Sequence, residues 1–194
     1  MTRVAAAAAI GFLALVPVGG SAEPASEREQ FEIRHYLVQG DSGEALRRSI
    51  DAAGPPGPDG ARWAGRTDWT LRYRFWTRST GGPCRVERVS VTLTTLMTLP
   101  HWAGAPAATA PLRERWASFL SALRLHEDGH RRHGQLGADA LEQRLAALPP
   151  QPDCPAMDAA VRPVADEIIA RHAAMGPEYD RATDHGRRQG AVFP

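Results

Sequence analysis

The stretch His126-Glu127-Asp128-Gly129-His130 decides how the rest of this sequence is interpreted. In a helix, residues four apart lie on the same face, so the imidazoles of His126 and His130 can converge on one Zn²⁺ ion. Glu127 then lies beside the metal, where in this motif it is not a ligand but the general base that takes a proton from water. The stretch therefore predicts a helix that carries a zinc site.

The residues around this motif have the spacing of a long amphipathic helix. Pro111 suits its first turn. Apolar residues then recur at helical spacing until the Pro149-Pro150 pair: Leu112, Trp116, Phe119, Leu120, Leu123, Leu141, Leu145 and Leu148. A second helix is predicted from Met157 to Met175, with its regular part starting at Pro163.

Three segments before the motif alternate in the manner of strands, at residues 31–38, 69–76 and 85–99. The break at residues 80–83 suits a hairpin, so we expect a three-stranded antiparallel sheet. Between the first two strands, Ser42 is expected to cap a short helix from Glu44 to Ala53. The predicted fold class is α+β, with a small antiparallel sheet packed against the motif helix and a second C-terminal helix. The strand at 85–99 is expected to be an edge that aligns an extended peptide.

The N-terminus has the features of a secretory signal. Arg3 precedes an apolar run from Val4 to Val18, which is followed by small residues up to Ala22. We expect residues 1–22 to be a signal peptide and residues 23–194 to form a single periplasmic or secreted domain. The apolar run is shorter than the roughly 20 residues that span a bilayer, so no membrane anchor is expected after cleavage.

Charge content limits the classes of partner that we expect, and cysteine content predicts a disulfide. The 23 basic residues, all arginine, are interspersed with 22 acidic ones, and this even mixture predicts no nucleic-acid partner. We expect a monomer that acts on a peptide or protein substrate. Because export leads to an oxidising compartment, Cys84 and Cys154 are expected to form a disulfide rather than to act as catalytic thiols.

A catalytic zinc site needs a third protein ligand in addition to the two histidines of the motif. His133 lies seven residues beyond His126, a rise of about 10 Å, which is too far for one ion to bind both. We favour His185, because Gly186 beside it permits close backbone approach. Glu167 and Asp180 are the alternatives.

Tyr179 has two interpretations. Its hydroxyl could donate a hydrogen bond to the negative charge that develops on the substrate oxygen. Equally, the side chain could anchor the C-terminal segment against the core.

Several motifs together resemble those of a known family. They are Leu99-Pro100-x-Trp102, Trp116, the His126–His130 motif, Tyr179-Asp180-x-x-Thr183-x-His185-Gly186, Gln189-Gly190 and the pair Cys84 and Cys154. Over about residues 30–192 the chain resembles the bacterial secreted proteins of domain of unknown function 922, a group predicted to be zincin-like, zinc-dependent proteases. The resemblance implies a zincin-like fold, a secreted metallopeptidase and a site that includes the tail at residues 179–186.

We therefore expect an exported zinc peptidase in which His126, His130 and His185 bind Zn²⁺ and Glu127 activates water. One alternative is a zinc-stabilised, non-catalytic periplasmic binding module, whose closed site would need a fourth ligand such as Asp180. Another is a zinc hydrolase that acts on a different amide, such as a cell-wall peptide.

Overall fold

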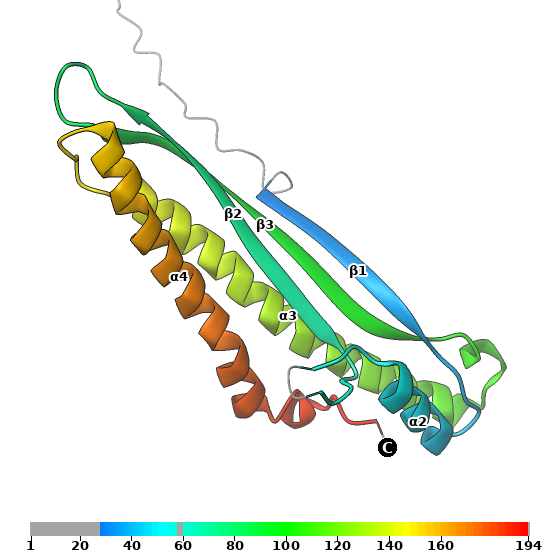
Figure 1. Cartoon of the computed structure of the whole chain (residues 1–194). Coiled ribbons are helices and arrows are strands. Elements are labelled where there is room, and N and C mark those ends of the chain that lie inside the picture. The colour runs from blue at the N-terminus through cyan, green and yellow to red at the C-terminus, as the bar shows by residue number, and fades with distance from the viewer. Residues whose placement is uncertain (1–27, 58–59, 194) are drawn as a thin grey trace, which may run out of the picture.

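The computed structural model describes residues 28–57 and 60–193. Its elements are β1 (Glu29–Val38), α2 (Gly43–Ala53), β2 (Arg66–Arg78), β3 (Arg85–Trp102), η1 (Ala105–Ala107), α3 (Ala110–Ala146), α4 (Cys154–Thr183) and η2 (Arg187–Gln189). The predicted α+β class is confirmed: α3 lies along a three-stranded sheet and α4 runs beside α3 (Figure 1). The expected signal peptide lies outside the described residues. Among those residues, no helix has the length and apolar character to cross a bilayer.

The sheet has the strand order β1-β3-β2. Strands β2 and β3 form the predicted antiparallel hairpin. The expectation of an entirely antiparallel sheet is wrong, because β1 pairs with β3 in parallel, with Glu29 opposite Leu93 and Val38 opposite Trp102. Helix α2 and the loop after it carry the chain away from β1 before β2 begins, so β1 and β2 occupy opposite sides of β3. The segment 85–99 is thus in the central strand, and β2 is an edge.

Helix α3 is continuous, as predicted, and its motif lies between two apolar clusters. The first cluster gathers around the N-terminal half of α3 and includes Trp102, Trp116 and Phe119. The second surrounds the C-terminal half and includes Leu141 and Val161. Packing on both sides therefore holds the motif, whose polar side chains occupy the gap between the clusters.

Helix α4 is longer than predicted at both ends. It starts at Cys154, where the Asp153 side chain accepts a hydrogen bond from the backbone N–H of Ala156, and it continues through Pro163 and Pro177 to Thr183. Each proline removes one hydrogen bond from a helix interior. Burial of one helix face against α3 offsets these losses. As a result, residues 176–183, which lie beyond the predicted end of the helix at Met175, form the last turns of α4.

Cys84 and Cys154 form the predicted disulfide, which joins the β2-β3 hairpin to the first turn of α4. Serine at both positions is expected to lower the free energy of unfolding by about 4 kcal/mol in the chain-entropy model, because the bond links residues separated by 70 positions. Urea denaturation of the oxidised protein and of the double variant measures the difference. An unchanged transition midpoint would contradict the prediction.

Candidate metal centre

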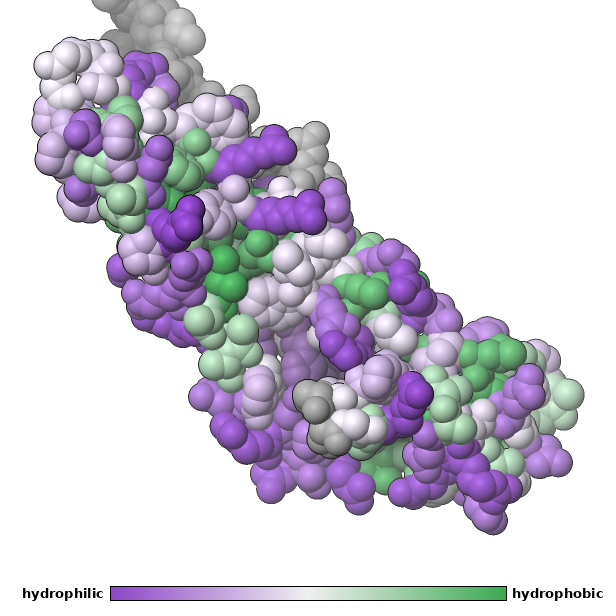
Figure 2. All heavy atoms as spheres, viewed as in Figure 1, coloured by the Kyte–Doolittle hydropathy of each residue, from purple (hydrophilic) through white to green (hydrophobic). Residues whose placement is uncertain are grey.

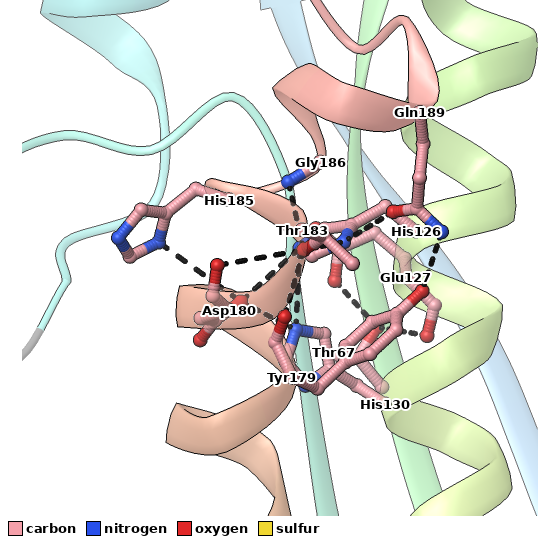
Figure 3. Close-up of polar contacts among 10 residues, drawn as sticks. All are labelled: Thr67, His126, Glu127, His130, Tyr179, Asp180, Thr183, His185, Gly186 and Gln189. Carbon is pink, nitrogen blue, oxygen red and sulfur yellow. Dashed lines mark hydrogen bonds and ion pairs between the residues drawn. The ribbon is translucent and has the colours of Figure 1, made fainter.

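Three side chains from α3 and α4 place their ligand atoms around one point (Figure 3). Nε2 of His126 and Nε2 of His130 are 3.3 Å apart. Oδ1 of Asp180 lies 3.2 Å from the first and 3.0 Å from the second. Tetrahedral Zn²⁺ holds such atoms at roughly 2.0–2.1 Å, which separates neighbouring ligands by about 3.3 Å. The three atoms therefore have the spacing of three corners of a zinc coordination sphere.

The structure brings Asp180 into this group and leaves His185 outside it. Position 180 faces the two histidines because α4 stays helical up to Thr183 and packs beside α3. The His185 side chain is 61% exposed, its Nδ1 is 3.9 Å from Asp180, and its ring points away from the group in Figure 3. That ring contacts Trp63 instead. Glu167, the other alternative, forms an exposed ion pair with Arg171.

The three groups are electrostatically coupled. Burial alone would raise the pKa of Asp180, but hydrogen bonds from His126 and His130 outweigh it and hold that pKa well below its usual range. Burial tends to lower the pKa of His126, yet Asp180 and Glu127 raise it overall. The surroundings thus favour positive charge at this point, which a metal cation can supply.

Glu127 lies next to the three ligand groups without belonging to them. Its side chain is buried, and its Oε2 accepts a hydrogen bond of 2.8 Å from the Thr67 hydroxyl on β2. Burial raises the pKa of Glu127, and the Thr67 hydroxyl together with the two imidazoles offsets only part of this increase. Gly65 leaves room for the carboxylate, since a Cβ there would be 2.6 Å from Oε1.

The ring of His126 is held from behind by residues that follow α3 in the sequence. Gln189 Oε1 accepts a 3.0 Å hydrogen bond from His126 Nδ1, which leaves Nε2 free to face the site. The Gln189 amide in turn donates to the Tyr179 hydroxyl at 2.9 Å. Tyr179 stacks on His126 and lies against Gly129, where a Cβ would be 2.3 Å from the hydroxyl oxygen. Tyr179 therefore packs against the His126 ring and binds Gln189, and its expected role as a donor to the substrate oxygen stays a prediction.

A left-handed turn after α4 brings Gln189 to this place. Asp184, His185 and Gly186 have φ values of 52°, 49° and 78°. Gly186 packs against His126, and a Cβ there would be 2.9 Å from Cγ of the imidazole. The close approach that the sequence suggested at Gly186 therefore serves His126, not His185.

The ligand groups and Glu127 form the floor of a groove of about 780 Å³. One wall is the segment 62–71, which includes the start of β2, and the other is a face of α4 that includes Ile169, Ala173 and Pro177. Figure 1 shows α3 between these two elements. The groove is large enough for a segment of extended peptide.

Comparison with known proteins identifies one family. Residues 33–186 match the family described as "Bacterial protein of unknown function (DUF922)". The matched span includes both histidines of the motif, Glu127 and Asp180, whereas Gln189 lies beyond it. No curated protein and no solved structure matches the chain.

Proposed function

Because the chain belongs to this bacterial family of unknown function, we propose its activity from its own site: it is an exported zinc-dependent peptidase that hydrolyses peptide bonds. The observation that carries the proposal is the group of His126, His130 and Asp180, with Glu127 beside it on the floor of a groove.

The donor set suits zinc. Two imidazole nitrogens and one carboxylate oxygen are common ligands of catalytic Zn²⁺, which keeps a further position open for water or substrate. Zn²⁺ in such a site is a Lewis acid that polarises a carbonyl group and lowers the pKa of water to about 7. His126, His130 and Asp180 would hold the ion.

Glu127 performs the proton transfers in this proposal. It takes a proton from the attacking water and gives it to the departing amine. The Thr67 hydroxyl donates a hydrogen bond to Oε2 and so orients the carboxylate for this role. A general base works best when its pKa approaches the working pH, and burial moves the pKa of Glu127 in that direction.

Strand β2 is the element suited to align the substrate. It is an edge strand, and its first residues line the groove. An extended peptide can add to such an edge through main-chain hydrogen bonds. The expectation that residues 85–99 form such an edge is wrong, because they belong to β3, which is paired on both sides.

The number of ligands favours catalysis over the alternative of a zinc-stabilised binding module. Structural zinc sites are usually closed by four protein ligands. Within the described part of the chain, the group contains three.

Zinc binding and hydrolysis together test this function. Zinc at 100 times its Kd is expected to stabilise the folded protein by about 2.7 kcal/mol, which corresponds to a rise in Tm of about 5–10 °C at this size. The purified protein is then incubated with an unfolded protein and with a diverse peptide library. Hydrolysis is expected without a chelator and should be lost when a chelator is present. Zinc binding without hydrolysis of these substrates would overturn the peptidase assignment.

Gln189 is expected to increase the affinity for zinc although it is not one of the three candidate ligands. Leucine at this position removes the nearer acceptor of the His126 Nδ1–H bond and leaves the Thr183 hydroxyl, at 3.4 Å, as a remaining polar neighbour of that nitrogen. We expect zinc affinity to fall by about 10–100-fold. Competition with a chromophoric chelator measures the change. Gln189→Glu keeps an acceptor and should retain more affinity. Arg188→Leu is the matched control, because within the described residues Arg188 bonds to the Ala182 carbonyl alone. Equal losses in both leucine variants would contradict the prediction.

A further inference from the structure

The two ends of the groove differ in chemistry. On the side of the site that leads toward the disulfide, the lining side chains are mostly apolar and include Leu71, Ile169 and Ala173. On the opposite side the lining includes Arg62, Arg66 and Arg187. Figure 2 shows hydrophobic residues between α4 and β2 midway along the molecule, and hydrophilic residues around the lower end.

The arginine end carries excess positive charge. Arg66 is paired with Asp68, which also lines the groove. Arg62 donates to the Gly54 carbonyl and has no acidic partner among the described residues. Arg187 lies 3.4 Å from Asp184, but both side chains are more than half exposed, so this pair is weak. A carboxylate is the complementary group for Arg62 and Arg187.

The direction of β2 relates these two ends to a peptide. Thr67 lies beside Glu127, and Leu71 lies farther along the strand, against Gly137, so β2 runs from the arginine end toward the apolar end. Antiparallel pairing is the more stable arrangement per residue. A peptide paired in this way has its N-terminal part in the apolar end and its C-terminal part beside the arginines.

We propose that the groove selects extended peptides with apolar side chains before the cleaved bond and a carboxylate after it. This inference rests on the proposed peptidase function and adds the class of substrate. The carboxylate is supplied by an acidic side chain or by the C-terminus of the peptide, because both present the same group to Arg62 and Arg187.

Binding to the zinc-loaded Glu127→Gln variant tests the inference without turnover. The probe is a fluorescent octapeptide, amidated at its C-terminus, with leucine and valine in its first half and aspartate in its second half. It is expected to bind about fivefold more tightly than the same peptide with asparagine in place of aspartate, and arginine should weaken binding further. An asparagine peptide with a free C-terminus that binds as tightly as the aspartate peptide would identify the terminal carboxylate as the preferred source.

Reversing the charge of one groove arginine is a second test of carboxylate recognition. Arg187→Glu, made in the same inactive background, is expected to invert the preference between the aspartate and arginine peptides. Arg188→Glu should leave that preference unchanged, because Arg188 does not line the groove. The inference would be overturned if all the amidated peptides bound equally. It would also be overturned if a peptide with its apolar and acidic halves exchanged bound as tightly as the original aspartate peptide.

Hydrolysis of the same peptides by the unsubstituted protein separates this inference from the proposed function. Selective binding without cleavage would overturn the peptidase function and retain the recognition of carboxylate. Cleavage of all the peptides at equal rates would overturn the recognition alone.

Discussion

Glutamine in place of Glu127 is expected to reduce kcat for peptide hydrolysis by about 10²–10⁴-fold while zinc binding is retained. The substitution keeps the shape of the side chain and an oxygen that can accept the Thr67 hydrogen bond, but it removes the group that takes up a proton. Zinc content and kcat are measured on the same preparation, so that loss of turnover is not confused with loss of metal.

Asp128→Asn is the matched control for this experiment. Asp128 is the next residue in the chain, its side chain is 46% exposed, and its ion pair with Arg131 spans 3.9 Å. Exposed pairs of this kind contribute little, so the control should retain activity. Full turnover in Glu127→Gln would exclude Glu127 as the base, and loss of zinc in that variant would assign it to the ligands.

Alanine in place of Asp180 is expected to weaken zinc binding by more than the roughly 100-fold that the loss of an outer-shell partner costs. The Oδ1 atom of Asp180 lies within 3.2 Å of Nε2 of both imidazoles, so the substitution removes one of the three candidate ligand atoms. His185→Ala should change the affinity little, because the imidazole is exposed and lies outside the group.

Competition titrations on both variants compare these two candidate ligands directly, with circular dichroism to verify that each variant is folded. A large loss in His185→Ala together with a small loss in Asp180→Ala would restore the set of three histidines expected from the sequence.

The features that can be predicted from the sequence are those that depend on residues close together in the chain. The apolar stripe of α3 predicts its length, and the four-residue spacing of His126 and His130 predicts their convergence. Ser42 stands directly before a helical pattern, which predicts the cap that its side chain forms with the backbone N–H of Ala45. Each of these features depends on residues within a few turns of one another.

Other features depend on contacts between distant segments. Strand alternation indicates which side chains of β1 share a face but not which strand it pairs with, so it does not predict the parallel pairing with β3. The helix expected from the sequence ends at Met175, and packing against α3 keeps the chain helical beyond that point to Thr183. Thr67 and Gln189 bond to residues 60 and 63 positions away, and nothing in their own sequence neighbourhoods marks them. The resemblance did include Gln189, without assigning it a role.

Helix α4 connects the disulfide at Cys154 to the candidate ligand Asp180. A helix of that span extends about 39 Å. Over this length, tilting the helix axis by about one degree displaces the far end by about 0.7 Å. A functional group must be placed to within about 0.5 Å of its productive position. The position of Asp180 in the candidate metal centre is therefore fixed by the whole contact between α3 and α4. Buried residues such as Ala165 and Ile168 contribute to it although they are not candidate ligands.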